Sequence, residues 1–417
     1  MADDGTVTGL RLTDAVSLGV LASFVPRDAV GEAVQAAGKG ARRRGGKLPP
    51  HVVTYFVMAM ALFAGEDYEE VQERLTGTLR DWGCWEERWE PATPGAITQA
   101  RQRLGEEPLA RLFGQVAVPA AEEDTAGAFL GPWRLMSIDG CEWDVPDSPQ
   151  NAAAFGYPGG EAAFPKIRVV TVAECASHAP VLAAMSGTGT GKGSGEQSLA
   201  RELYPRLEDG WLLLSDRNFC SWDGWCAAAD TGAALLWRVK AGLRLPVLQV
   251  LPDGSWLSVL ISPALKARPA ARQQVIDAAA AGQDLDPAVA RYVRALEYQV
   301  PDRDGNGKDE QVILITTITA WQDAPAPALA RAYHQRWEHE TGNGQQKTVL
   351  RGPGRILRSR SPAMARQELW GYLLTHWAIS TLICQAATAA GIDPDRVKFT
   401  RTVRIIRRHA DDPAFSP

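Results

Sequence analysis

Two aspartates stand where predicted strands end, and their positions are the first indication of a chemical site. Asp139 ends the apolar run Leu-Met-Ser-Ile-Asp-Gly, and Asp216 ends a second run, Leu-Leu-Leu-Ser-Asp-Arg. A carboxylate at the end of a strand, followed by a glycine or a polar turn, commonly lies at a functional edge of a sheet. Because many such aspartates only form turns or cap helices, the pair indicates a site without defining its chemistry.

A third element adds four functional side chains at helical spacing. Tyr333, Arg336, Glu340 and Lys347 fit the pattern Y-x2-R-x3-E-x6-K. On one helix that turns 100° per residue, these positions fall within an arc of roughly 60°. One helical face would then carry an aromatic hydroxyl, a bidentate phosphate binder, a carboxylate and a cation. The alternative is a solvated helix in which Arg336 and Glu340 pair at i,i+4, although that alternative leaves the two aspartates unexplained.

These residues and their surroundings resemble the insertion sequence 4 family of DDE transposases, which are bacterial cut-and-paste enzymes. The resemblance runs from about Leu12 to Arg408, almost the whole chain, and the four-residue signature is specific to the family. It rests on four segments: Ser-Ile-Asp139-Gly-Cys-Glu-Trp-Asp-Val-Pro-Asp-Ser-Pro-Gln-Asn, Leu-Leu-Leu-Ser-Asp216-Arg-Asn-Phe, Tyr333-His-Gln-Arg336-Trp-Glu-His-Glu340 and Arg351-Gly-Pro-Gly-Arg355-Ile-Leu-Arg358-Ser.

The resemblance implies an α/β fold with a ribonuclease-H-like catalytic core, a β-rich insertion before the glutamate helix, and a helical N-terminal domain. It implies that Asp139, Asp216 and Glu340 are catalytic and bind two Mg²⁺ ions, for which Mn²⁺ can substitute. The chemistry agrees, because magnesium prefers oxygen ligands. Two ions ~3.5–4 Å apart can activate a water and stabilise the leaving oxygen of a phosphodiester.

The resemblance also implies which residues touch DNA. Tyr333, Arg336 and Lys347 would hold the terminal nucleotides and phosphates of the element, and an aromatic residue of the insertion, with Trp256 as a candidate, would stack on a flipped base. From Tyr333 to Arg408 the chain has thirteen Lys or Arg against five Asp or Glu, a net charge of +8 in a chain whose total is −5. Binding to a DNA backbone requires such a local basic surface. The further DNA-binding residues expected on it are Arg351, Arg355 and Arg358.

The elements that must position these residues follow from length and composition. A chain of 417 residues is too long to fold around a single hydrophobic core of ordinary size, so two or three structural units are expected. The expected segments are a helical DNA-binding domain at 1–128, the first part of the catalytic core at 129–242, a β-rich insertion at 243–320, the second part of the core with the glutamate helix at 321–390, and a basic tail at 391–417.

Hydrophobic periodicity predicts individual elements within these segments. Expected helices are Asp14–Phe24, Val52–Leu62, Ala96–Leu104 and Glu196–Leu207, followed by helical structure from Ala328 to Ala390. Expected strands are Arg134–Val145, Lys166–Glu174, Pro180–Met185, Trp211–Ser215, Ala233–Val239, Val247–Leu251, Trp256–Ile261, Arg291–Val300 and Gln311–Thr319. Their order suits a mixed sheet. Whether Arg101 and Arg103 face DNA or mark a plain surface helix stays open.

Several other classes of site are disfavoured. The loop from Gly187 lacks the first glycine of a phosphate-binding loop, and the Asp302–Gly307 turn has Ile313 where a calcium loop needs glutamate. Six cysteines without a C-x-x-C pair argue against a zinc site of the usual spacing and fit a reducing cytosol. No apolar stretch is long enough to span a membrane, and Asp3 and Asp4 argue against a leader.

One segment departs from the family pattern. After Glu340 the chain reads Thr-Gly-Asn-Gly-Gln-Gln, where relatives carry apolar helix formers and an acidic residue. Gly342 and Gly344 would each cost a helix about 1 kcal/mol relative to alanine. The helical phase between Glu340 and Lys347 is therefore open at this point.

The leading hypothesis is a DNA transposase of the bacterial cytoplasm and nucleoid that excises and integrates an insertion sequence. Its partners would be double-stranded DNA, both element ends and target, and a second copy of itself in a synaptic homodimer. The alternative from another class is an inactive or domesticated DNA-binding protein with a degenerate transposase site. A nuclease that cuts without joining would use the same residues.

Overall fold

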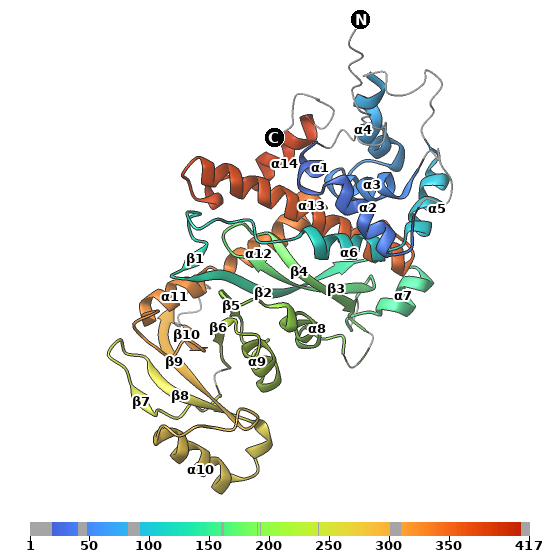
Figure 1. The fold of residues 1–417 in the computed structure, drawn as a ribbon. Coiled ribbons are helices and arrows are strands. Elements are labelled where there is room, and N and C mark those ends of the chain that lie inside the picture. The colour runs from blue at the N-terminus through green and yellow to red at the C-terminus, as the bar shows by residue number, and fades with distance from the viewer. Residues whose placement is uncertain are drawn as a thin grey trace, which may run out of the picture.

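The structure is a computed structural model in which helices cover both faces of one large mixed sheet (Figure 1). It describes residues 19–40, 48–81, 92–159, 162–189, 191, 193–240, 242–300 and 310–409. The calcium-like turn at Asp302–Gly307 lies outside these residues.

The sheet has ten strands, and its central part carries the two candidate aspartates. The strands are β1 (Phe129–Leu130), β2 (Trp133–Asp144), β3 (Lys166–Glu174), β4 (Pro180–Gly187), β5 (Trp211–Ser215), β6 (Ala234–Arg238), β7 (Gln249–Val250), β8 (Trp256–Ile261), β9 (Ala290–Val300) and β10 (Glu310–Thr316). Their order is β4-β3-β2-β5-β6-β10-β9-β8-β7, with β1 beside β2. β2, β5 and β6 run parallel and the other pairs antiparallel, so the mixed sheet predicted from the sequence is confirmed.

Helices cover the two faces of the sheet unequally (Figure 1). One face is packed by α8 (Glu196–Leu203), the 3₁₀ turn η1 (Tyr204–Arg206) and α9 (Trp222–Ala229). The other is packed by α11 (Ala326–His334), α12 (Trp337–Gly344), the π-helix η3 (Gln345–Leu350) and α13 (Pro362–Ala389). Alternation along β2 explains this division, because Met136 and Ile138 join the α8 core while Leu135 faces α11.

The N-terminal helices form a layer with α13 and the C-terminal helix. They are α1 (Gly19–Phe24), α2 (Arg27–Ala36), α3 (Pro50–Leu62), α4 (Tyr68–Asp81), α5 (Pro94–Leu104) and α6 (Glu107–Val116), with α7 (Pro149–Phe155), the 3₁₀ turn η4 (Pro394–Arg396) and α14 (Phe399–His409) nearby. α3 is buried almost all round, and it packs directly on α13. A β-carbon at Gly371 would lie 2.8 Å from the Val57 carbonyl oxygen, so only glycine permits this close approach.

The insertion continues the main sheet. β10 pairs with β6, placing Ile315 opposite Trp237, and β9, β8 and β7 follow outward with α10 (Pro269–Ala280) packed on β8. The buried Arg294 binds Asp253 in the turn before β8 and the Ala324 carbonyl ahead of α11. The insertion is thereby fastened to the segment that leads into the glutamate helix.

The helix expected to run from Tyr333 to Lys347 is not continuous, and the single-arc expectation was wrong. α11 ends at His334, and hydrogen bonds of the i→i+3 type follow, such as Arg336 N to Tyr333 O at 3.1 Å. α12 then begins at Trp337 and passes directly into the π-helix η3. The expected C-terminal tail also differs, since α14 is a folded helix packed on η3 and α13.

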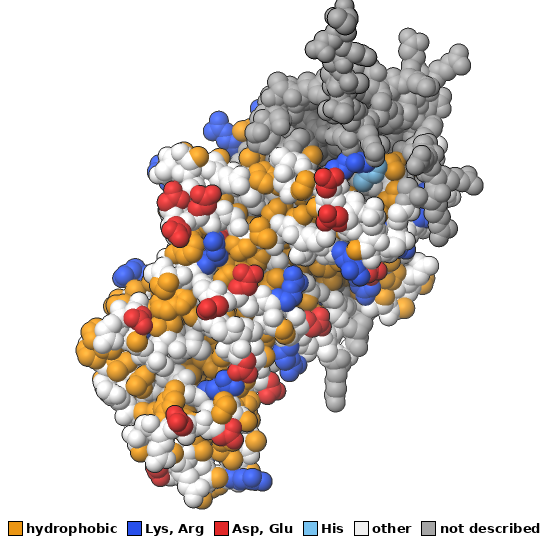
Figure 2. Space-filling model, viewed as in Figure 1, with side chains coloured by type: hydrophobic (Ala, Val, Ile, Leu, Met, Phe, Trp, Pro, Cys, Tyr) orange, Lys and Arg blue, Asp and Glu red, His pale blue; other side chains and the backbone are white. Residues whose placement is uncertain are grey.

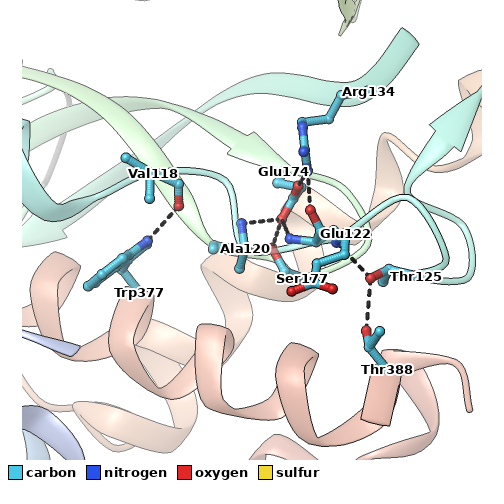
Figure 3. A network of polar contacts seen from close by, with 11 residues as sticks. Val118, Ala120, Glu122, Thr125, Arg134, Glu174, Ser177, Trp377 and Thr388 are labelled. Atoms are coloured by element: carbon cyan, nitrogen blue, oxygen red, sulfur yellow. Dashed lines mark hydrogen bonds and ion pairs between the residues drawn. The ribbon is translucent and has the colours of Figure 1, made fainter. Parts of the chain in front are cut away.

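A polar network fixes the hairpin between β3 and β4 to its surroundings (Figure 3). The fully buried Glu174 carboxylate forms an ion pair with Arg134 and accepts hydrogen bonds from the backbone of Ala120 and Ala121 and from the Ser177 hydroxyl at 2.6 Å. Ala120 and Ala121 belong to the loop between α6 and β1. The same loop contacts α13, where the Thr125 hydroxyl forms a hydrogen bond with the Thr388 hydroxyl at 2.8 Å. The turn at Ser177 is therefore held from several sides.

Surface charge is mixed. On the face drawn in Figure 2, acidic and basic side chains alternate over the sheet and the insertion, with apolar side chains between them.

Within the described part of the chain, no helix combines the length and apolar character needed to cross a membrane, and α13 is no exception.

Arg101 lies inside the helical layer, so neither of the two alternatives left open for it, a DNA-facing helix or a plain surface helix, holds for this residue. Its side chain is 0% exposed and binds Gln367 Oε1 at 2.9 Å, Ser359 Oγ at 3.0 Å and the Tyr68 hydroxyl. Arg103, two residues on, is exposed.

We predict that Arg101→Ala lowers the free energy of unfolding by about 3 kcal/mol, because it leaves several buried polar partners unsatisfied. Arg103→Ala, the matched control, should change it by less than about 0.5 kcal/mol. Denaturant unfolding of both variants measures the difference. Equal effects would contradict the structural role of Arg101.

Candidate active site

Adjacent parallel strands bring Asp139 and Asp216 together. Ile138 lies opposite Ser215 in the β2–β5 pairing, so the two aspartates occupy the next position on each strand. Each carboxylate is oriented by a backbone N–H: Asp139 Oδ1 accepts from Gly140 N inside β2, and Asp216 Oδ1 accepts from Asn218 N in the turn after β5, both at 2.8 Å. The register of the parallel pairing between β2 and β5 accounts for this juxtaposition.

A buried histidine docks α12 on the same face of the sheet. His339 Nδ1 lies 3.1 Å from the Ser137 carbonyl oxygen, and its Nε2 lies 2.8 Å from the Thr171 hydroxyl. Because a carbonyl can only accept, Nδ1 carries the proton and Nε2 accepts from Thr171. Burial, followed by the nearby Arg336 charge, lowers the pKa of His339 to about 3, so the ring stays neutral. Ser137 and Thr171 flank Asp139 on β2 and β3, which places α12 beside that aspartate.

Residues along α12 and η3 contact successive residues of β2. His339 meets Ser137, and Asn343 donates to Asp139 Oδ2 at 3.4 Å. Farther along, the Lys347 charge acts on Cys141, and the Arg351 guanidinium lies 5.0 Å from the centroid of the Trp143 ring. Four helical residues rise about 6 Å, close to the ~6.7 Å of two strand residues. Every fourth residue of the helical segment therefore lies beside every second residue of β2.

Glu340 stands at the open side of this arrangement. Its side chain is 55% exposed, and its Oε1 accepts from Arg336 Nη2 at 2.8 Å. The Arg336 charge also acts on Asp139. Asp139, Asp216 and Glu340 do not form a group whose ligand atoms all lie within 4.8 Å of one another. The structure therefore pairs Glu340 with Arg336 and does not bring the three carboxylates into one cluster.

Two further side chains belong to the site and were not among the predicted residues. Asn343 lies three residues after Glu340 on α12, so its helical spacing from the glutamate could have identified it. Glu196, at the start of α8, reaches the site from the opposite face: a β-carbon on Gly140 would lie 2.7 Å from its Oε1. No local sequence signal marks Glu196, because its proximity depends on the absence of a side chain at Gly140.

The carboxylates influence one another electrostatically. Burial, with a contribution from the Asp216 charge, raises the pKa of Asp139. Burial also raises the pKa of Glu196, and the charges of Asp139 and Asp216 add to that effect. Mutual repulsion of this kind favours binding of a cation. The donor set consists of carboxylate oxygens, which suit Mg²⁺ or Mn²⁺. The residues therefore fit divalent ions, provided that Glu340 rotates away from Arg336.

Tyr333 and the predicted DNA-binding arginines make contacts within the protein. Tyr333 is 6% exposed, and its hydroxyl donates to the Ser215 carbonyl oxygen at 3.4 Å, next to Asp216. Arg355 and Arg358 donate to the carbonyls of Ala64 and Glu66 at 2.8 and 2.9 Å, just beyond the end of α3. These arginines satisfy free carbonyls and offset the helix dipole. Their contacts with DNA stay a prediction.

Comparison with known proteins places this geometry in context. Residues 15–114 match the family described as "Insertion element 4 transposase N-terminal". "Transposase InsG for insertion sequence element IS4" of Escherichia coli (strain K12) is 28% identical over 368 residues, which cover 87% of this chain and 76% of that protein. "Putative transposase InsZ" of the same strain is 28% identical over 150 residues, covering 35% of this chain and 49% of that protein.

A solved structure also aligns along the chain. It is the piggyBac transposase synaptic complex with hairpin DNA, with a TM-score of 0.46 and 11% identity. The alignment covers 96% of this chain and 82% of that one.

The two glycines after Glu340 adopt helical conformations, and neither has a positive φ. A β-carbon at Gly342 would meet His178 no closer than 3.5 Å, an ordinary contact, and one at Gly344 would meet nothing within 4 Å. The loop glycine Gly352, in contrast, has a φ of +92°.

We predict that Gly342→Ala with Gly344→Ala raises the free energy of unfolding by up to about 2 kcal/mol, because alanine favours the helix. Gly352→Ala should lower it by about 1 kcal/mol or more, because alanine is strained at positive φ. Denaturant unfolding compares the two. Loss of stability in the double variant would show that the glycines are required for packing.

Proposed function

The chain is a DNA transposase of the insertion sequence 4 family, and we propose that Asp139, Asp216 and Glu340 are the carboxylates with which it cuts and joins DNA. The juxtaposition of Asp139 and Asp216 on paired parallel strands, with the glutamate helix docked beside them, carries this proposal. Glu196 and Asn343 would complete the polar lining of the site.

The proposed catalytic core is ribonuclease-H-like. Supporting it are the antiparallel run β4-β3-β2, the parallel strands β5 and β6 beside it, and helices on both faces. The division proposed along the chain is a helical DNA-binding domain at 1–128, a core at 129–242 and 321–390, an insertion at 243–320 that extends the core sheet, and a C-terminal segment at 391–417 that includes α14.

Two Mg²⁺ ions bound by these carboxylates would supply an activated water, or in the joining step an activated 3′ hydroxyl, and charge for the leaving oxygen. The residues of the chain then have separate tasks. Asp139 and Asp216 are oriented by the backbone N–H groups of Gly140 and Asn218, whereas the exposed Glu340 is able to rotate. Arg336 would exchange Glu340 for a DNA phosphate, because its planar fork suits both groups. Binding of DNA would thereby free the third carboxylate.

The DNA path is proposed to pass α14. Arg401, Arg404 and Arg408 are exposed on one face of this helix, and none makes an ion pair with a residue that the structure describes. Lys398 precedes them at the same spacing. Arg407, which points inward, instead binds the Leu62 carbonyl at 2.6 Å. A homodimer on paired element ends completes the proposal.

The test for activity uses supercoiled plasmid that carries the ends of the element, incubated with protein and Mg²⁺. Excision with joining is expected. Nicking alone would indicate a nuclease, and DNA binding without cleavage would indicate an inactive DNA-binding protein.

We predict that Asp139→Asn, Asp216→Asn and Glu340→Gln each abolish strand cleavage while binding of end DNA persists, because each removes a metal ligand without changing the shape of the site. Asp209→Asn, in an exposed turn, is the matched control and should cleave normally. Gel analysis of cleavage and a binding titration separate the two effects. Full cleavage by any of the three variants would remove that residue from the proposed site.

We predict that Arg404→Glu with Arg408→Glu weakens binding to DNA of any sequence and flattens its salt dependence, by a slope of about 0.9 for each phosphate that the protein no longer neutralises. Lys266→Glu, an exposed charge reversal in the insertion, serves as the control and should leave the slope unchanged. Binding isotherms over a range of salt concentrations measure both. An unchanged slope in the α14 variant would exclude this face from the DNA path.

A further inference from the structure

A second group of potential metal ligands lies outside the proposed active site. His178 Nε2 lies 3.1 Å from Glu338 Oε2 and 3.0 Å from Asp395 Oδ1. The three residues come from the β3–β4 turn, α12 and η4, and their ligand atoms all lie within 4.8 Å of one another. None of them is Asp139, Asp216 or Glu340.

The histidine nitrogen is buried and lies at ion-pair distance from two carboxylates; burial lowers the pKa of His178, but the contacts with Asp395 and Glu338 outweigh it and raise this pKa to about 9. The His178 side chain is only 10% exposed, yet Nε2 has no hydrogen-bond partner among the described residues, because neither carboxylate oxygen meets the required geometry. Two ligands at right angles around one ion, each ~2.1 Å from it, would lie about 3.0 Å apart. The observed nitrogen–oxygen separations match that spacing.

The other ring nitrogen of His178 faces a side-chain amide. Gln345 lies between two imidazoles, with its Nε2 3.1 Å from His178 Nδ1 and its Oε1 2.9 Å from His376 Nε2. Rotation of this amide by 180°, which exchanges its oxygen and nitrogen, would let Nδ1 donate to the oxygen and leave the lone pair of Nε2 free for an ion, as in metal-binding histidines. The amide nitrogen would then donate to His376, which burial keeps neutral by lowering its pKa to about 3.

The backbone around His178 is held in an uncommon conformation. His178 is the only described non-glycine residue with a positive φ, at 59°. The preceding Ser177 is anchored by Glu174, in the network shown in Figure 3. A strained residue that its neighbours hold in place is characteristic of a functional position.

We propose that His178, Glu338 and Asp395 bind one divalent first-row cation, Mn²⁺ or Zn²⁺, at a structural site. One imidazole and two carboxylates suit these ions. The group lines a pocket of about 950 Å³, from which water can complete the coordination. The basic side chains of Lys398, Arg401, Arg404 and Arg408 line the same pocket, but they are exposed and therefore screened by solvent, whereas His178 is buried.

The proposed ion would join three segments that are distant in sequence. Glu338 lies two residues before Glu340 on α12, and Asp395 precedes α14. Bound metal would therefore fasten the glutamate helix to the β3–β4 turn and to the C-terminal segment. Stabilisation of the folded chain by the ion follows from mass action, whether or not the protein is active on DNA.

The test uses the full chain with Asp139→Asn and Asp216→Asn, which removes the other candidate site. Titration calorimetry with Mn²⁺, and separately with Zn²⁺, is expected to show one bound ion and a raised melting temperature. His178→Ala and Asp395→Asn should each weaken binding at least about tenfold and remove the rise in melting temperature. Asp323→Asn, the same change at an exposed position, is the control and should retain both.

Two results would overturn the proposal. Failure of both ions to bind the parent protein at millimolar concentration would mean that the carboxylates hold only a protonated histidine. Binding that persists in the Asp395→Asn variant, a near-isosteric change at a half-exposed side chain, would place the ion elsewhere. Because the measurements require no DNA and no cleavage, they are independent of the proposed catalytic role.

Discussion

The docking of α12 on the central strand is the constraint on which the candidate site depends. A neutral, buried imidazole joins this helix to β2 and β3 through His339, Ser137 and Thr171. From that point the helix follows β2 in steps of four residues against two, which places Asn343 at Asp139. Glu340 follows His339 directly, so its backbone is positioned by the same docking, and its exposed side chain pairs with Arg336. Without this register, the third carboxylate would have no fixed relation to the other two.

The same region connects the catalytic strands to the helical layer. The arginines after η3 and on α14 do not all face solvent: Arg355, Arg358 and Arg407 bind carbonyls from Leu62 to Glu66 at the end of α3. The close contact of Gly371 with Val57 brings α13 against the same helix. DNA bound along the exposed face of α14 would therefore act on a rigid body that includes η3 and the end of β2. The arginines of this segment therefore stabilise packing against α3, in addition to their proposed role in binding DNA.

The strands were predictable from the sequence, whereas the details of the site were not. β3 and β5 match the predicted ranges because turn residues bound short apolar runs, and pairing of such strands aligns Asp139 with Asp216. Periodicity cannot reveal the break at Gln335 or the π-helix, since both depend on how the chain packs on β2. Arg101 looked like a surface charge because its buried partners on α4 and α13 are distant in sequence. Glu196 reaches the site only because residue 140 is glycine.

The most direct test of this account is the single-turnover rate of end cleavage by His339→Phe, at saturating DNA and Mg²⁺. The variant keeps an aromatic ring in the cavity but loses the hydrogen bonds of the imidazole with Ser137 and Thr171 that hold α12 on the sheet. The account predicts a fall of roughly a hundredfold in rate, because a misplacement of about 1 Å at a catalytic group has that effect. DNA affinity and a cooperative melting transition should be retained. Cleavage at the wild-type rate would contradict the claim that this docking positions Glu340.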